Sequence, residues 1–332
     1  ADGNYLKSVR RHDFSKEVTL LDQPAHGACT MFRRSVLEEI GGYDESFRKQ
    51  DGYDVWLKII KLYRVSNINL PLFFYRQTPK SLSSNETSLL SVRARILQKH
   101  ANKSANEKLK VLTIVPVRGP DIDSRSKPHE LIGGIPLIGW TLEAAIQSQH
   151  LQDIVVSTPD PTVISYVTQE YKGRISALQR DRHLADINLD LKQTITEIFH
   201  RYREKGREYN AVLILNIDSP FRSSIYIDKC IDTMRIHDVD VVIGVKIDDG
   251  DMFVHHGNGL KRLMPGAQFR LERNDLFRRV GGFVLFKWGP NQAATMELTE
   301  ENIGHIVLDQ KAALSINTEL DLSIARSLAL AQ

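Results

Sequence analysis

Three basic side chains follow a short apolar run, in a loop that also contains glycine. Residues 111–115 read VLTIV, and Arg118, Gly119, Arg125 and Lys127 come soon after them. A glycine lets the backbone approach phosphate oxygens closely, and guanidinium and ammonium groups hold those oxygens by charge and hydrogen bonds. This combination of residues predicts a polyphosphate-binding loop.

Such a loop needs regular elements on both sides to position it. After residue 110, short apolar runs alternate with segments of helical periodicity. We expect strands at 111–115, 154–157, 211–215, 239–245 and 280–286, and helices at 139–147, 164–171, 189–203, 225–237 and 319–330. This alternation predicts an α/β fold with a mostly parallel, doubly wound sheet, whose ligands bind at the carboxyl ends of the strands.

The composition is that of a folded globular protein. Of the 332 residues, 42% are hydrophobic and 26% are charged, which excludes a disordered chain or a fibrous repeat. The net charge of +3 is too small to argue for a nucleic-acid partner. No apolar run reaches the roughly 18 residues of a membrane span. The two cysteines, Cys29 and Cys230, lie far apart, which suits a reducing compartment and predicts a cytoplasmic protein.

A polar stretch at residues 97–110 divides the chain into two parts, and we interpret it as a helix end followed by a linker. The first part, residues 1–96, is net basic, whereas the second part, residues 111–332, is slightly acidic. In the first part we expect a helix at 36–40, a helix capped by Asp51, a strand at 71–77 and a helix at 82–99. The sequence therefore predicts two domains.

Five segments of the second part carry a family resemblance. They are PVRG with SKPHELIGGIPLIGWTLEAA between 116 and 145, IVVSTP at 154–159, LILNIDSPFR at 213–222, RNDLFRRVGGFVLF at 273–286 and INTELDLSIA at 316–325. In order and spacing they resemble the CMP-sialic acid synthetases (N-acylneuraminate cytidylyltransferases). The resemblance covers about residues 109–330 and supports the same doubly wound, nucleotidyltransferase-like sheet.

The resemblance implies a nucleotidyltransferase of nucleotide-sugar metabolism. In that family, a hydroxyl of a nonulosonic, sialic-type sugar acid attacks the α-phosphate of CTP and releases pyrophosphate, with Mg²⁺ as cofactor. By matching motifs, it assigns catalysis to Arg118 and Lys127, nucleotide binding to Arg118, Gly119, Lys127 and Asn216, sugar binding to Ser219, Arg222, Gly281 and Gly282, and metal binding to Asn317. Relatives are often dimers, so we expect a homodimer formed through residues 248–270.

Several motif positions depart from the family pattern. Ile122 replaces the first lysine of the phosphate loop, and Asp121 and Asp123 add negative charge there. At 315–317, Ser-Ile-Asn replaces a metal-binding Asp-Ile-Asp. Because Mg²⁺ prefers carboxylate oxygens, Asn317 offers it only a neutral carbonyl. A degenerate, non-catalytic scaffold therefore remains an open alternative.

The first part resembles another family. Its matching segments are GACTMFRRSVLEEIGGYDESF at 27–47, QDGYDVWLKI at 50–59 and LPLFFYRQTPKSLSSN at 70–85. They resemble the acceptor-binding half of the family-2 glycosyltransferases, used in surface polysaccharide synthesis. That resemblance implies a general base at Asp51, although a helix cap explains this residue equally well. The nucleotide-binding half and its Asp-x-Asp motif do not precede this segment, and the first methionine is Met31. We therefore expect a fragment whose glycosyltransferase activity needs a longer parent chain.

Overall fold

A computed structural model describes residues 30–60, 62–65, 86–103, 109–186, 189, 191–248, 250, 252–262, 276–289 and 302–330. The chain divides into two compact units, one of Ala1–Ile96 with Ile247–Arg278, the other of Leu97–Lys246 with Arg279–Gln332. Cys29 and the strand expected at 71–77 lie outside the described residues. None of the described helices is long and apolar enough to span a membrane.

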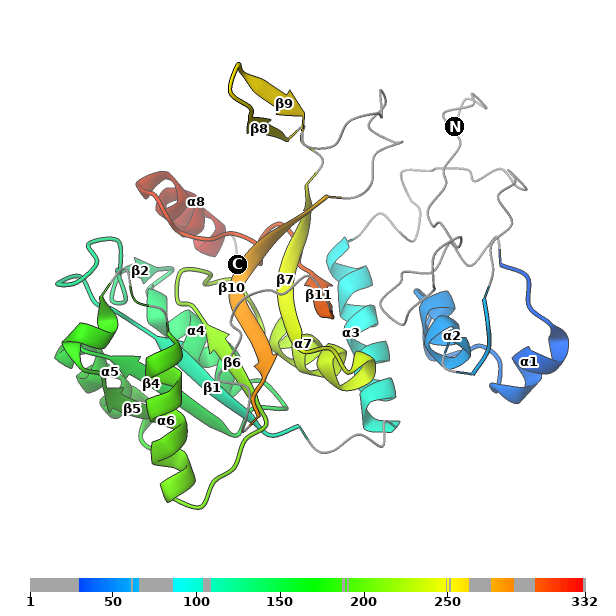
Figure 1. Cartoon of the computed structure of the whole chain (residues 1–332), viewed down its shortest axis with the longest axis horizontal. Helices are drawn as coiled ribbons and strands as arrows, with labels where there is room; N and C mark the ends of the chain where they lie inside the picture. Colours follow the sequence, from blue (N-terminus) through cyan, green and yellow to red (C-terminus); the bar gives the residue numbers. More distant parts are fainter. Residues whose placement is uncertain are drawn as a thin grey trace. The chain divides into compact units, whose positions relative to one another are not determined.

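The second unit is built on a seven-stranded sheet of order β11-β7-β10-β6-β1-β4-β5 (Figure 1). The strands are β1 (Val111–Pro116), β4 (Asp153–Thr158), β5 (Ser176–Gln179), β6 (Ala211–Leu215), β7 (Val241–Asp248), β10 (Leu276–Lys287) and β11 (Ile303–Val307). β1 pairs in parallel with β4 and β6, β4 with β5, and β7 with β11, whereas β10 runs antiparallel to β6. The predicted mostly parallel α/β fold is confirmed.

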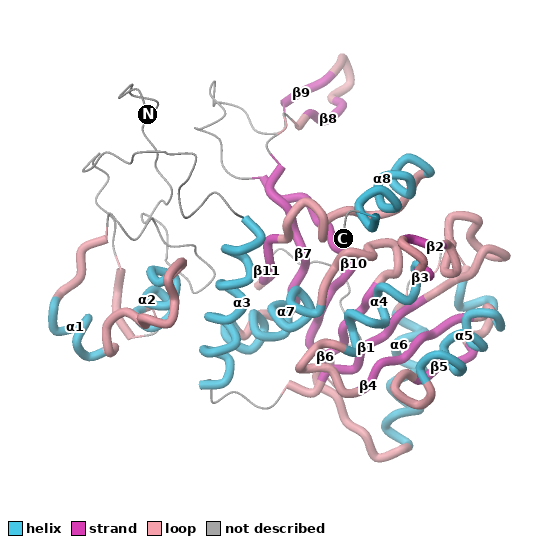
Figure 2. The backbone as a smooth tube through the Cα atoms, turned by 180° about the vertical axis from the view of Figure 1, so that it is seen from behind, coloured by secondary structure: helices cyan, strands magenta, loops and turns pink. Residues whose placement is uncertain are grey.

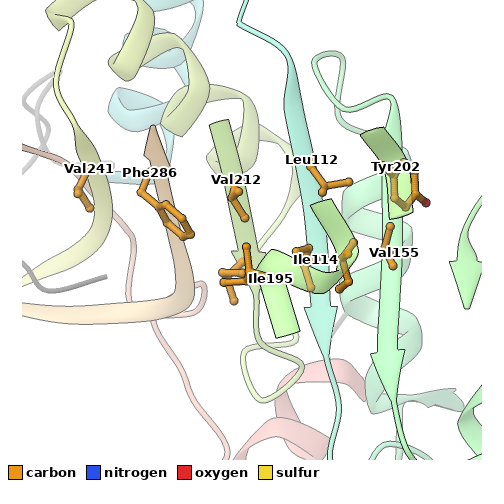
Figure 3. Close-up of a cluster of buried hydrophobic side chains, with 10 residues drawn as sticks. Leu112, Ile114, Val155, Ile195, Tyr202, Val212, Val241 and Phe286 are labelled. Atoms are coloured by element: carbon orange, nitrogen blue, oxygen red, sulfur yellow. The ribbon is translucent and has the colours of Figure 1, made fainter. Parts of the chain in front are cut away.

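Helices cover both faces of this sheet. They are α4 (Leu137–Ile146), α5 (Pro161–Tyr171), α6 (Lys192–Glu204), α7 (Ser224–His237) and α8 (Glu319–Leu330). Leu112 and Ile114 of β1 belong to the core cluster that includes Ile195 and Ile198 of α6 (Figure 3). Val111, Thr113 and Val115, which alternate with them along β1, are also buried, so a second layer must cover the other face. Figure 2 shows α4 and α7 on that face, with α6 behind the sheet.

Four short strands form two hairpins that are not part of the main sheet. β2 (Leu131–Ile132) pairs with β3 (Ile135–Pro136) in the loop between β1 and α4. β8 (Phe253–His255) pairs with β9 (Leu260–Arg262) in the first unit. A short 3-10 helix, η2 (Arg182–Ala185), follows β5.

The described part of the N-terminal hundred residues is helical. It contains α1 (Arg34–Glu39), α2 (Asp51–Ile59) and α3 (Glu86–Lys103), so the expected helices are present. The predicted capping role of Asp51 is wrong, because Asp51 is already the first residue of α2. The N-cap is Gln50, in a left-handed conformation with φ of 57°, and it makes no side-chain cap. Asp51 is exposed, and its role as a general base stays a prediction.

Candidate functional site

The candidate site lies at the carboxyl ends of neighbouring strands. β1 is followed by Arg118, β4 by Asp160, β5 by Arg180 and β6 by Asp218. Because β6, β1, β4 and β5 are consecutive and parallel in the sheet, these ends lie along one edge. This edge is where open α/β sheets bind ligands.

Two arginines lie close together there without a carboxylate partner. Arg118 donates from Nε to the carbonyl oxygen of Ala185 at 3.0 Å and from Nη2 to that of Asp186 at 3.5 Å. Arg180 is 3% exposed and donates from Nη2 to the carbonyl oxygen of Val117 at 2.8 Å, while its buried Nε has no hydrogen-bond partner. Within the described residues, neither guanidinium forms an ion pair.

The electrostatics of this arginine pair favour an anion. Burial, together with the charge of Arg118, lowers the pKa of Arg180 to about 10. Two adjacent cations repel each other, and burial removes the water that would screen them. An anionic ligand would relieve both effects, and phosphate oxygens match the fork geometry of guanidinium groups. The sequence motifs predict Arg118 at this site but do not indicate Arg180.

Gly119 brings the loop close to the end of the neighbouring strand β4, whereas its predicted contact with phosphate stays a prediction. Its φ is +81°, and a Cβ at this position would lie 2.6 Å from Oδ2 of Asp160. Its backbone N–H donates to Oγ of Ser126 at 3.2 Å. Only glycine satisfies both the backbone conformation and this close approach.

The negative charge of the loop is largely neutralised within the loop. Asp123 accepts hydrogen bonds from Nε, Nη2 and the backbone N–H of Arg125, at 3.0 to 3.1 Å. The side-chain hydrogen bonds from Arg125 are the main reason that the pKa of Asp123 is lowered. Asp123 is thus ion-paired rather than facing a ligand as a free charge, which corrects the expectation for this residue. Asp121 is exposed.

Lys127 already has a protein partner. Its Nζ forms an ion pair with Glu319, the first residue of α8. The side chain of Lys127 is 37% exposed and that of Glu319 is 77% exposed, so the pair lies in solvent. A ligand that binds Lys127 therefore competes with this carboxylate for the ammonium group.

Arg222 lies beneath the site rather than on its surface. It is 1% exposed, and it donates from Nη1 to the carbonyl oxygens of Gly281 at 2.7 Å and Gly282 at 3.1 Å, and from Nη2 to Oγ1 of Thr141 at 3.2 Å. Both terminal nitrogens also reach the carbonyl oxygen of Asn216, at 3.4 and 3.3 Å. These contacts correct the assignment of Arg222 to direct sugar binding: it is a positioning residue that fixes the loop after β6 against the turn in β10.

The other residues assigned to the nucleotide and sugar surround this anchor. The side chain of Asn216 is exposed, and its backbone N–H donates to the carbonyl oxygen of Gly282 at 2.7 Å. Ser219 is fully buried, with its Oγ 2.9 Å from Oγ of Ser315. The structure therefore brings Asn216, Ser219 and the Gly281-Gly282 turn together at one end of β6.

Asp218 is a carboxylate at this end to which the motif match assigns no role. Its Oδ1 is buried and has no hydrogen-bond partner in the described part of the chain. Burial raises the pKa of Asp218, and the charge of Arg222 only partly opposes this effect. The carboxyl group therefore holds its proton more readily than an exposed aspartate does.

The predicted magnesium site does not fit the residues present. Asn317 is exposed, and its backbone N–H donates to Oδ2 of Asp321 at 3.0 Å. Asp321 also accepts from Thr318, so Asn317 belongs to the start of α8. In the described parts of the chain, no group of three or more His, Cys, Asp or Glu residues is arranged so that it could hold a metal ion. Asp218 alone, disfavoured as an anion by burial, does not make a magnesium site.

Comparison with known proteins is consistent with this geometry. Residues 113–270 match the cytidylyltransferase family model. The match contains Arg118, Arg180, Asp218 and Arg222, whereas Gly281, Gly282 and Asn317 lie beyond it.

One relative is the CMP-N,N'-diacetyllegionaminic acid synthase of Legionella pneumophila. The two sequences are 29% identical over 134 residues, which is 40% of this chain. The chain spans 57%, just over half, of that relative. The glycosyltransferase resemblance of residues 1–100 stays a prediction.

Two solved structures show that the fold is shared with cytidylyltransferases. The 4-diphosphocytidyl-2C-methyl-D-erythritol synthase from Anaerococcus prevotii superposes with a TM-score of 0.50 at 13% identity, covering 68% of this chain and 97% of that one. Another 4-diphosphocytidyl-2C-methyl-D-erythritol synthase gives a TM-score of 0.51 at 15% identity, covering 68% and 100%.

Proposed function

We propose that residues 111–332 transfer the cytidylyl group of CTP to a sugar acid of the nonulosonic, sialic or legionaminic type. The products are a CMP-sugar and pyrophosphate. The observation that carries the proposal is the pair Arg118 and Arg180 at the strand ends, where neither guanidinium is ion-paired with a carboxylate of the described residues. The family match over 113–270 and the legionaminic acid synthase relative support the choice of nucleotide and acceptor.

The strand order suggests how the two substrates divide the edge of the sheet. Arg118 and Arg180 serve the β1–β5 side, where they hold phosphate oxygens of CTP. Asp218, Ser219 and the Gly281-Gly282 turn serve the β6–β10 side, where the acceptor binds. Fixed guanidinium groups stabilise the negative charge that builds on the phosphates as the transfer proceeds.

The reaction balances without a further reactant. The acceptor hydroxyl oxygen forms a bond to the α-phosphorus of CTP, the bond from that phosphorus to the bridging oxygen breaks, and pyrophosphate leaves with the electron pair. The hydroxyl proton passes to the Asp218 carboxylate, whose raised pKa makes it a better proton acceptor than an exposed aspartate. No step of this proposal runs through Mg²⁺, because the described residues do not form a site for it.

The test is pyrophosphate release from CTP in the presence of sialic-type and legionaminic-type acids, with ATP and UTP as controls. We expect release with CTP and at least one acid, and loss of release in Arg118→Gln. Tight CTP binding by calorimetry without any release would instead favour the non-catalytic scaffold. Absence of both binding and release would refute the proposal.

We also propose that the chain forms a homodimer through the β8–β9 hairpin. This hairpin exposes apolar side chains, with Phe253 51%, Val254 47% and Leu260 71% accessible. Exposed apolar groups gathered on one hairpin are typical of an interface. Light scattering should give the mass of a dimer, and Leu260→Asp should give a monomer, whereas Leu62→Asp, at a residue 65% exposed elsewhere, should leave the mass unchanged.

A further inference from the structure

Two ion pairs join the loop between β1 and α4 to helix α8. Lys127 pairs with Glu319, and Glu130 pairs with Arg326. Beneath them, Ile132 of the loop belongs to the same buried cluster as Leu322 of α8. The loop and the helix are therefore held together by an apolar contact, and the ion pairs lie at its solvent-exposed edge.

The two pairs have opposite polarity. In the first pair the loop supplies the cation and α8 the carboxylate, whereas in the second pair the loop supplies the carboxylate and α8 the cation. A polyphosphate bound to the loop can displace Glu319 from Lys127. It does not bind Glu130, because both groups are negatively charged. The two pairs thus provide a built-in comparison between a carboxylate that competes with phosphate and one that does not.

We propose that Glu319 is a built-in competitor of the nucleotide for Lys127. In the ligand-free protein the carboxylate of Glu319 is ion-paired with the ammonium group of Lys127. Phosphate oxygens of the substrate displace this carboxylate. When pyrophosphate has formed, Glu319 recaptures Lys127 and so weakens the hold of the site on this product. The inference rests on the proposed function, which places a polyphosphate at this loop.

The position of Glu319 makes this exchange reversible. Hydrogen bonding and the charge of Lys127 lower the pKa of Glu319, so the carboxylate stays ionised at neutral pH. As the first residue of α8, Glu319 also faces the positive end of the helix dipole, which stabilises its charge after Lys127 has left. Because solvent-exposed ion pairs are weak, the competition lowers affinity only by about two- to fivefold.

The test measures dissociation constants for CTP, pyrophosphate and tripolyphosphate by calorimetry at low ionic strength. We expect Glu319→Gln to bind all three about two- to fivefold more tightly than the wild-type protein, and to show a lower inhibition constant for pyrophosphate. Lys127→Gln should bind them more weakly. In the Lys127→Gln background, Glu319→Gln should have no further effect, because its competitor role requires the lysine. Added salt should reduce the gain.

Glu130→Gln is the matched control, and we expect it to leave the three dissociation constants unchanged. Thermal unfolding of every variant checks that the fold is intact. The proposal is overturned if Glu319→Gln binds tripolyphosphate no more tightly than wild type, or if Glu130→Gln gives the same gain. Tripolyphosphate binding that responds to Glu319→Gln without any CTP binding would support the competitor and refute the proposed function. Binding of no anion at all would refute both.

Discussion

Arg118 follows β1 and Arg180 follows β5 at the same edge of the sheet, and the charge of Arg118 helps to lower the pKa of Arg180. Both are held by backbone carbonyl groups, those of Ala185 and Val117, rather than by carboxylates. Hydrogen bonds to backbone carbonyl groups thus hold two like charges at the same edge of the sheet. Such an arrangement is unfavourable in the free protein and becomes favourable when an anion binds.

Removing one of these charges should weaken nucleotide binding. Because hydrogen bonds to charged groups contribute about 1.5–3 kcal/mol, Arg118→Gln should raise the dissociation constant for CTP by roughly 10- to 100-fold. Calorimetry at fixed ionic strength measures the change. Arg201→Gln is the control, since Arg201 lies on α6, where it pairs with Glu197, and its effect should be at least several-fold smaller. Equal effects of the two substitutions would argue against a specific role for Arg118.

Arg222 should stabilise the fold through the geometry of its hydrogen bonds and not through its charge alone. Its guanidinium satisfies the carbonyl oxygens of Gly281, Gly282 and Asn216 inside the protein. Lysine keeps the charge but cannot reach these acceptors in the same fork geometry, and each buried carbonyl left unpaired costs about 1–3 kcal/mol. Arg222→Lys should therefore lower the free energy of unfolding by roughly 2–5 kcal/mol, measured by urea denaturation.

The control for this prediction is an arginine on the protein surface. Arg201 forms an ion pair with Glu197 on α6, and its side chain is 46% exposed. Arg201→Lys should change the free energy of unfolding by less than about 0.5 kcal/mol. If both substitutions have the same small effect, the buried hydrogen bonds of Arg222 do not stabilise the fold.

The sequence predicted the central strands and most helices because their signals are local. β6 and α8 have the predicted bounds, and β1 and β4 extend only slightly beyond them. β5 was missed because residues 176–179 read SALQ, a stretch at the sheet edge with only one large apolar residue. Without β5, Arg180 could not be placed at the carboxyl edge, so its role at the site could not be predicted either.

The pairings of the site residues depend on contacts between distant segments, which spacing does not reveal. The sequence shows Lys127 as a free cation, yet Glu319, almost two hundred residues later, neutralises it. The motif match likewise assigns Arg222 to sugar binding, whereas three segments surround its side chain. Family motifs singled out these residues, but only the fold distinguishes a ligand-binding side chain from one that positions the backbone.

Asp218 should make the stability of the protein depend on pH. Because burial raises the pKa of Asp218 above its unfolded value, the folded state binds more protons than the unfolded state between the two pKa values. The contribution of Asp218 to stability is therefore fully present below the unfolded pKa and is lost as pH rises through the folded pKa. In Asp218→Asn, which has no carboxyl group at this position, the free energy of unfolding should not fall for this reason as pH rises.

The measurement is the difference in free energy of unfolding between Asp218→Asn and wild type across pH 4 to 8. We expect the free energy of unfolding of Asp218→Asn to increase relative to that of the wild-type protein as pH rises. Asp240 serves as the opposite case, because hydrogen bonds from Asn302 and Lys287 lower its pKa. Asp240→Asn should therefore lose stability relative to wild type as pH rises from the acid range. A pH-independent difference for Asp218→Asn would contradict the assignment of its raised pKa.

Gly282 should be intolerant of a side chain for two separate reasons. Its φ is +57°, which costs a non-glycine residue about 1 kcal/mol, and a Cβ would lie 2.7 Å from Oγ of Ser219. Gly206 has φ of +72° but no neighbouring atom within 4 Å of such a Cβ, so Gly206→Ala isolates the backbone cost. We expect Gly282→Ala to lower the free energy of unfolding by roughly 1–3 kcal/mol more than Gly206→Ala does, because overpacking adds to the strain.

Gly282→Ala should also slow pyrophosphate release, since Ser219 and Asp218 share this loop, whereas Gly206→Ala should leave the rate unchanged. Equal losses of stability in the two variants would show that the loop after β6 moves aside, and that the Gly281-Gly282 turn does not fix its position.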